Sequence, residues 1–140
     1  MNKLKLTVLL ITTAIFLTAC QDKEAGKLDN RVLAYWNYKI NKDFKSAYQF
    51  LSPGWRESES KTEYSNRMEQ NLINWKSAKI VSKECSKGNI CKVKVIIIYE
   101  YMFRGAISKK MTIPTNITEN WIMINNTWYM IPVKNNFGKN

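Results

Sequence analysis

The sequence predicts an α+β domain in which three helices precede a four-stranded antiparallel sheet. As far as Trp75, apolar residues recur at three- and four-residue spacing, which is typical of helices. After Trp75 they alternate with other residues, which is typical of strands. Turn-forming residues at Arg104-Gly105 and Asn125-Asn126 then divide the second half of the chain into strands.

The three helices are expected before residue 76. The first covers about residues 28–41, and its apolar face holds Leu28, Val32, Tyr35, Trp36 and Ile40. Asp43 opens a short second helix with an apolar side made by Phe44, Ala47, Tyr48 and Leu51. We expect Ser52-Pro53-Gly54 to end that helix, because proline cannot continue it. Ser60 followed by Glu63 is a capping box, which predicts a third helix carrying Tyr64, Met68, Leu72 and Trp75.

Four strands are expected in the second half. They cover about residues 78–84, 91–103, 107–124 and 127–133. The third is expected to be interrupted near Pro114, which lacks a donor for the sheet and belongs at an edge or bulge.

The first twenty residues have the form of an export signal. Lys3 and Lys5 are followed by an apolar, uncharged stretch of about a dozen residues, which is too short to span a bilayer. The end of this stretch, Leu17-Thr18-Ala19-Cys20, resembles the lipobox of bacterial lipoproteins. The resemblance implies a signal peptide over residues 1–19 and lipidation of Cys20. The alternative is an ordinary secreted protein in which this cysteine is incidental.

The same resemblance predicts an address in the bacterial cell envelope, with the membrane as a partner through the N-terminal lipid. Gln21 follows the cysteine, and an aspartate at that position favours retention in the inner membrane of such lipoproteins. We therefore favour the outer membrane, facing the periplasm, over the inner membrane. A lipidated tether is expected over residues 20–27, a single domain over 28–133 and a frayed tail over 134–140.

The charge of the chain is strongly positive. The segment before Cys20 holds two of the 22 basic residues and none of the 11 acidic ones, so the remainder carries a net charge of +9. Either this charge attracts anionic lipid headgroups and other polyanions, or it only keeps the surface solvated. The four arginines are isolated, at positions 31, 56, 67 and 104, so we expect no nucleic-acid partner.

Cys85 and Cys91 are the cysteines left after Cys20. A three-residue hairpin loop at Lys87-Gly88-Asn89 would place them opposite each other, close enough for a cross-strand disulfide. The alternatives are a metal pair or a redox couple. The chain has no histidine to complete a metal site, and the spacing differs from that of redox motifs, so the disulfide is favoured and no metal is expected.

Two segments carry a resemblance to a fold family. The segment Ile40-Asn41-Lys42-Asp43-Phe44-Lys45-Ser46-Ala47-Tyr48 followed by Leu51-Ser52-Pro53, and the Trp121–Ile131 hairpin with its polar turn, resemble the cystatin-like, nuclear-transport-factor-2-like (SnoaL-like) proteins. This resemblance implies a curved sheet that closes around the first helix as a cone with an apolar mouth. The candidate lining residues are Tyr35, Trp36, Phe44, Tyr48, Tyr99, Tyr101, Trp121 and Trp128, unless these aromatic residues simply fill the core.

Three kinds of function follow from these features. Catalysis is not expected, because the chain lacks histidine and its nominated carboxylates, Asp43 and Glu100, have simpler roles as a helix cap and a surface group. No cofactor is expected. A non-catalytic accessory or protein-interaction module is favoured, and the alternative is a binder of a small apolar ligand or lipid. Ile96, Ile98 and Met102 mark a candidate face for another envelope protein or for a homodimer.

Overall fold

The computed structural model describes residues 27–71, 73–86, 89–102 and 110–133. The predicted signal peptide, the C-terminal tail and the tether except Lys27 lie outside these ranges, as does Cys20. The chain divides into two compact units, residues 1–30 and 31–140. Of the first unit only residues 27–30 are described, and they are helical. The fold below is that of the second unit.

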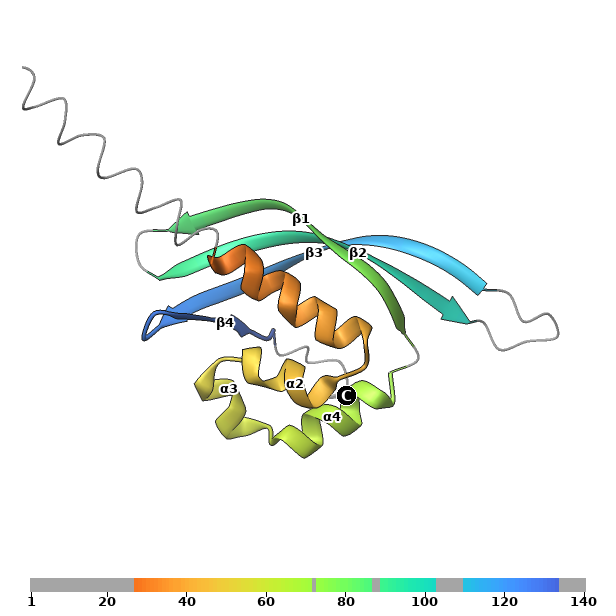
Figure 1. The fold of residues 1–140 in the computed structure, drawn as a ribbon, viewed down its shortest axis with the longest axis horizontal. Helices are drawn as coiled ribbons and strands as arrows, with labels where there is room; N and C mark the ends of the chain where they lie inside the picture. The colour runs from red at the N-terminus through yellow and green to blue at the C-terminus, as the bar shows by residue number, and fades with distance from the viewer. Residues whose placement is uncertain (1–26, 72, 87–88, 103–109, 134–140) are drawn as a thin grey trace, which may run out of the picture. The chain divides into compact units, whose positions relative to one another are not determined.

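The second unit has helical segments followed by a meander of strands (Figure 1). The helical segments are residues 31–40, which continue the helix that starts at residue 27, α2 (Phe44–Ala47), the 3-10 turn η1 (Tyr48–Phe50), α3 (Pro53–Ser58) and α4 (Lys61–Glu69). The strands are β1 (Asn74–Ser86), β2 (Ile90–Met102), β3 (Lys110–Ile124) and β4 (Thr127–Ile131). They form one antiparallel sheet in the order β1-β2-β3-β4.

The α+β class and the four antiparallel strands agree with the sequence prediction, but the predicted arrangement of three helices in a cystatin-like, nuclear-transport-factor-2-like cone is wrong. The described residues form four α-helices, and only the one over residues 27–40 is long. The second predicted helix is a single α-turn that tightens into η1, and α3 was not expected at all.

Pro53 explains the unexpected helix. Ser52-Pro53-Gly54 follows the end of the second helix as expected, since η1 ends at Phe50 and Leu51 is extended, but Pro53 is also the first residue of α3. Proline is favoured there because the first N–H of a helix has no partner within it and the fixed φ of proline suits the first turn. Ser52 is instead tied to the sheet, since its N–H donates to the carbonyl of Met130 at 2.8 Å.

The capping box of α4 is confirmed, but the end of this helix was predicted wrongly. Ser60 Oγ accepts from the N–H of Glu63 at 3.3 Å, and Glu63 Oε2 accepts from the N–H of Ser60 at 2.8 Å. The helix ends at Glu69, and Asn71 Oδ1 then accepts from the N–H of Ile73 at 3.1 Å, a local bond that competes with helix continuation. Trp75 therefore belongs to β1, opposite Tyr99, rather than to the helix.

One face of β2 is buried between Cys91 and Ile97. Cys91, Val93, Val95 and Ile97 are buried and alternate with the exposed Lys92 and Lys94. Figure 1 shows the helical segments gathered on one side of the sheet. The expected interruption near Pro114 is wrong, because β3 runs through it. Among the described residues β4 pairs only with Asn120–Ile124 of β3. Pro114 therefore lies on the edge of the sheet away from β2, where its missing N–H leaves no partner strand without a hydrogen bond.

The predicted disulfide is present. Cys85 and Cys91 are directly paired across β1 and β2, and their sulfurs are bonded. The pairing of Ser86 with Ile90 continues the same register toward the hairpin turn.

Candidate functional site

A cavity of about 300 Å³ lies between the helices and the sheet. The helix over residues 31–40 contributes Tyr35, Trp36 and Lys39 to its wall, and α4 contributes Tyr64, Arg67 and Met68. The sheet side is β3 at Ile117–Glu119. The remaining wall is largely apolar and consists of Leu51 and residues 130–133. The cavity therefore has a polar part near Lys39 and an apolar part near the end of β4.

Lys39 is the most unusual residue of this wall. Its side chain is only 8% exposed, although lysine is rarely buried without a partner. Nζ lies 3.8 Å from the ring centroid of Trp36, 4.6 Å from that of Trp75 and 5.1 Å from that of Tyr35. Rings at these distances stabilise a cation through their quadrupoles, but they accept no conventional hydrogen bond. Within the described part of the chain, Nζ donates no hydrogen bond.

Glu119 is the buried charge that complements Lys39. It is 7% exposed, and both carboxylate oxygens accept from indoles. Nε1 of Trp36 donates to Oε1 at 3.0 Å, and Nε1 of Trp121 donates to Oε2 at 3.0 Å. Trp36 thus touches both charges, with its ring facing the ammonium and its N–H bonded to the carboxylate.

Burial shifts the pKa values of both groups toward their neutral forms. It lowers the pKa of Lys39 to about 8, and the negative charge of Glu119 opposes this change. It raises the pKa of Glu119, against the hydrogen bond from Trp121, the charge of Lys39 and the hydrogen bond from Trp36. Burial also raises the pKa of Tyr35, whose hydroxyl lies 3.5 Å from that of Tyr64. The polar part of the cavity is therefore poorly solvated.

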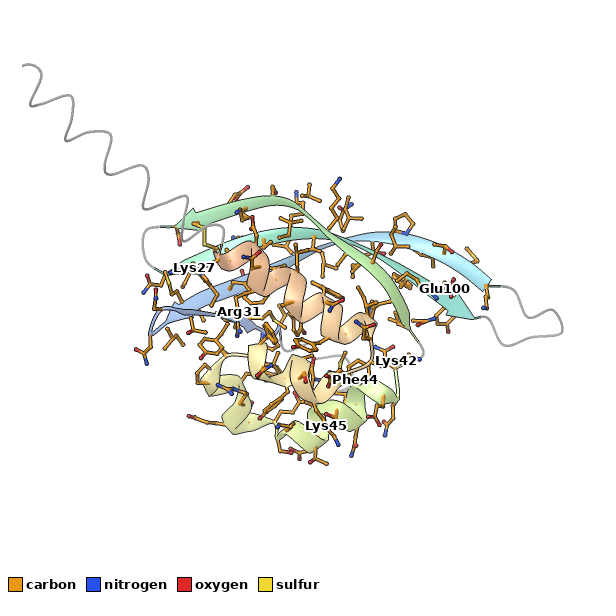
Figure 2. All side chains as sticks on the ribbon, viewed as in Figure 1. Lys27, Arg31, Lys42, Phe44, Lys45 and Glu100 are labelled. Atoms are coloured by element: carbon orange, nitrogen blue, oxygen red, sulfur yellow. A yellow bond between two sulfur atoms is a disulfide. The ribbon has the colours of Figure 1, made fainter. Side chains whose placement is uncertain are left out.

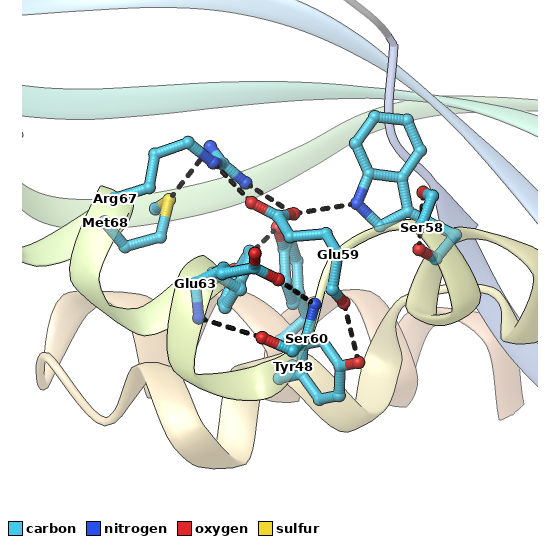
Figure 3. Close-up of polar contacts among 10 residues, drawn as sticks. Tyr48, Ser58, Glu59, Ser60, Glu63, Arg67 and Met68 are labelled. Atoms are coloured by element: carbon cyan, nitrogen blue, oxygen red, sulfur yellow. Dashed lines mark hydrogen bonds and ion pairs between the residues drawn. The ribbon is translucent and has the colours of Figure 1, made fainter.

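Arg67 stands at the edge of this polar part and is held by Glu59 (Figure 3). Its Nε and Nη2 donate to the two carboxylate oxygens of Glu59 at 2.7 and 2.9 Å. Nε1 of Trp55 donates to the same carboxylate at 2.9 Å, which fixes Glu59 further. The charge of Arg67 is thus already paired, whereas Lys39 donates to none of the described residues.

Lys39 and Met68 also line a second cavity of about 190 Å³. Its wall includes Lys42 and Phe44, which Figure 2 shows near the C-terminal end of the helix over residues 31–40, and Trp75. Lys39 therefore lines both cavities.

The structure brings together only some of the predicted lining residues. Tyr35 and Trp36 line the larger cavity, and Phe44 lines the smaller one. Trp121 and Trp128 are buried in the core, and the Tyr48 hydroxyl donates to the carbonyl of Glu59 at 2.8 Å, as Figure 3 shows. Tyr99 and Tyr101 are half-buried on β2 and line neither of these cavities.

Lys39 and Glu119 were missed by the sequence analysis. Lys39 lies four residues after Tyr35 and three after Trp36, on the face that the helical period assigns to the core. Glu119 lies two residues before Trp121, on the same face of β3. A charge at a core position was the signal that could have identified each of them.

The carboxylates that were nominated instead have structural roles. Asp43 caps α2, with Oδ1 accepting from the N–H of Ser46 at 3.0 Å. Glu100 forms an ion pair of 3.0 Å with Lys76 and lies near the end of β2, as Figure 2 shows. In the described ranges, no three side chains from histidine, cysteine, aspartate or glutamate gather as a metal site.

The candidate interaction face lies on the other side of the sheet. Ile96 and Ile98 are half-buried and alternate with the buried Val95 and Ile97. Ile96 lies between Lys79 and Asn116 in the register, and Ile98 lies between Ser77 and Pro114. The apolar strip is therefore narrow, and its use in self-association stays a prediction. The side chain of Met102 lies outside what is described.

The comparisons with known proteins bear on the fold alone. No family model matches the chain, and no curated protein matches it. The chain is similar to the solution structure of a SEC-C motif containing protein from Rhodopseudomonas palustris, with 14% identity, a TM-score of 0.50 and 69% of each chain covered. This likeness concerns the α+β fold. No helix in the described ranges is long and apolar enough to cross a membrane.

Proposed function

We propose that the protein is a lipid-anchored lipoprotein of the bacterial envelope whose domain binds a small, largely apolar ligand in the larger cavity. Lys39 carries the proposal, because a buried ammonium with unused donors on a cavity wall has a ready role in holding a ligand. Small-molecule sites typically combine apolar walls with a few such polar groups. The lipobox-like Leu17-Thr18-Ala19-Cys20 supports the anchor, and Gln21 supports the outer membrane.

Binding is favoured over catalysis by the state of the polar groups. Both oxygens of Glu119 already accept indole hydrogen bonds, which hold the carboxylate in place and favour its charged form. Tyr35 and Tyr64 lie deep in the protein, with pKa values raised by burial, so they stay protonated at neutral pH. These groups are suited to hold a fixed pattern of donors and acceptors around a bound molecule.

Native mass spectrometry of the full lipidated protein tests the proposal. Released from its membrane under mild conditions, the protein should carry a small non-covalent molecule that dissociates on activation. Ile117→Trp, which places a larger side chain on the cavity wall, should abolish this adduct. Ile113→Trp is the matched control, because Ile113 lies on the same face of β3 but outside the wall.

Two results would count against a binding role. The first is a wild-type protein that shows no adduct and takes up none of a panel of small apolar molecules. The second is an adduct that Ile117→Trp and Ile113→Trp retain equally, since the molecule would then lie elsewhere.

A further inference from the structure

The polar part of the larger cavity indicates the chemistry of the group that it accepts. Lys39 Nζ has three N–H donors, and the rings of Trp36, Trp75 and Tyr35 surround it without accepting them. Glu119, the negative charge that acts on it, has each carboxylate oxygen bonded to an indole N–H. A ligand that enters the cavity can therefore accept hydrogen bonds that no described residue accepts from Nζ.

We propose that the ligand is a small organic carboxylate whose carboxyl group accepts hydrogen bonds from Lys39 Nζ while its apolar body fills the rest of the cavity. This inference rests on the proposed binding function and adds the chemical class of the ligand. An ionised acceptor forms stronger hydrogen bonds with an ammonium than a neutral acceptor does.

The surroundings of Lys39 favour a carboxylate over the other common head groups. A ligand ammonium would place a second positive charge beside Lys39 and near Arg67, whose charge is already paired with Glu59. A hydroxyl could accept one hydrogen bond but carries no charge, whereas Glu119, the carboxylate that acts on Lys39, has both oxygens bonded to indole N–H groups. A carboxylate offers two oxygens and the opposite charge.

The size of the cavity limits the body of the ligand. A volume of about 300 Å³ is near the lower end for small-molecule sites. The volume therefore suits a small ligand. Leu51, Ile117 and Met130 supply apolar surface for such a body. A two-chain phospholipid is too large to be enclosed there.

A set of three probes with one body and different head groups tests the inference. Phenylacetate, 2-phenylethanol and 2-phenylethylamine are titrated by calorimetry into the full lipidated protein in lipid nanodiscs, with empty nanodiscs as the blank. We expect phenylacetate to bind most tightly and the amine to show no binding. Lys39→Met should weaken phenylacetate by about 10- to 100-fold, the range for a lost hydrogen bond to a charged group, and should weaken 2-phenylethanol less.

Lys45→Met is the matched control, because Lys45 is exposed on α2 and lines neither cavity, and it should bind phenylacetate as the wild type does. The head-group comparison needs only the wild-type chain, so it holds even where Lys39→Met does not fold. Equal binding of the alcohol and the carboxylate would overturn the inference while leaving the binding function intact. So would a Lys39→Met protein that keeps its phenylacetate affinity within about twofold. If none of the three probes binds, the carboxylate inference fails, while the binding function is decided by the adduct measurement.

Discussion

Glu119 is the single residue whose replacement should destabilise the domain most clearly. In Glu119→Gln, one indole N–H must face an amide NH₂ instead of an oxygen, and Lys39 loses its compensating charge. Breaking a buried set of this kind costs about 2 to 4 kcal/mol. We expect urea unfolding at neutral pH to show this loss in the free energy of unfolding.

Glu100→Gln is the control for this replacement. Glu100 also pairs with a lysine, Lys76, but both side chains are partly exposed and water screens their charges. A much smaller change in unfolding free energy is therefore expected. Equal losses of unfolding free energy in the two variants would mean that the burial of Glu119 does not increase its contribution to stability.

The stability of the domain should rise with pH above about 8 because of Lys39. The folded state releases the Lys39 proton near pH 8, whereas the unfolded chain holds it to about 10.5. Between these values the unfolded state binds more protons, so the free energy of unfolding increases with pH. The gain should reach about 1 to 2 kcal/mol by about pH 9.5. Urea midpoints at about pH 7.5 and 9.5 measure it.

The titratable groups that face Lys39 determine the pH range in which the change in unfolding free energy reports on Lys39. Burial raises the pKa of Glu119 of β3, and Arg67 of α4 keeps its charge throughout. Tyr35 and Tyr64 have raised pKa values, so the opposite contribution begins only when unfolded tyrosine ionises near pH 10. Lys39→Met should show no rise, and Lys45→Met should show the wild-type rise. A rise in Lys39→Met would assign the effect to another group.

The residues that were predicted correctly are those whose type agrees with the face or turn that the sequence pattern assigns to their position. Tyr35 and Trp36 are apolar residues on an apolar face, and Cys85 and Cys91 flank a turn signal at the spacing that pairs them. Lys39 and Glu119 contradict the pattern around them. A sequence pattern places a charge on the surface unless its partners are known, and the partners here are 80 residues apart along the chain. Only the fold brings them together.

At the scale of elements, the β1–β2 hairpin should depend on its disulfide only modestly. Cys85 and Cys91 close a short loop, with a sequence separation of 6. On the chain-entropy model such a loop contributes about 2 kcal/mol at most. The double variant Cys85→Ser, Cys91→Ala keeps the buried position 91 free of a hydroxyl. Its unfolding free energy should fall by no more than this amount.

Chemical reduction of the wild type is the comparison that isolates the bond. The reduced wild type and the double variant should unfold at similar urea concentrations, because both lose the same loop constraint. If the double variant is far less stable than the reduced wild type, packing at Cys91 rather than the disulfide accounts for the loss.

The limits of the helices were the least predictable elements, for local reasons. The Ser52-Pro53-Gly54 segment both follows the end of η1 and begins α3, and the sequence pattern indicated only the first of these roles. The apolar period through Tyr64, Met68 and Trp75 continued beyond the true end of α4. Trp75 fits both patterns because it is buried against Trp36 and Phe44 from a strand as well as it would be from a helix.

At the scale of the whole molecule, the order of elements was easier to predict than their arrangement. The change from helical to alternating period at Trp75 was enough for the α+β class and for four antiparallel strands. The named fold was wrong because short segments such as Ile40–Tyr48 constrain local structure but not how many helices cover the sheet. The cavity could not be predicted, since its wall comes from segments distributed between residues 35 and 133.

Self-association through the outer face of the sheet is a separate whole-molecule prediction. Ile96 and Ile98 lie among lysine, serine and asparagine in the register, so any contact there combines a narrow apolar strip with polar surroundings. If the face forms a homodimer, Ile96→Lys with Ile98→Lys should halve the mass measured by light scattering. A monomeric wild type would contradict the dimer. Ile90→Lys, at an exposed position of β2, is the control.

Attachment to the membrane should depend on Cys20 alone. Two acyl chains on a thiol-linked glycerol, with a third on the new amino terminus, would bind the membrane stably. A protein without these chains would bind the membrane only through its net charge of +9, and salt would release it. We expect palmitate labelling and salt-resistant membrane association in the wild type, and neither in Cys20→Ser. In a host with two membranes, Gln21→Asp should keep the lipid but move the protein to the inner membrane. Labelling that survives in Cys20→Ser would contradict the assignment, and so would a wild-type protein recovered with the thiol of Cys20 free.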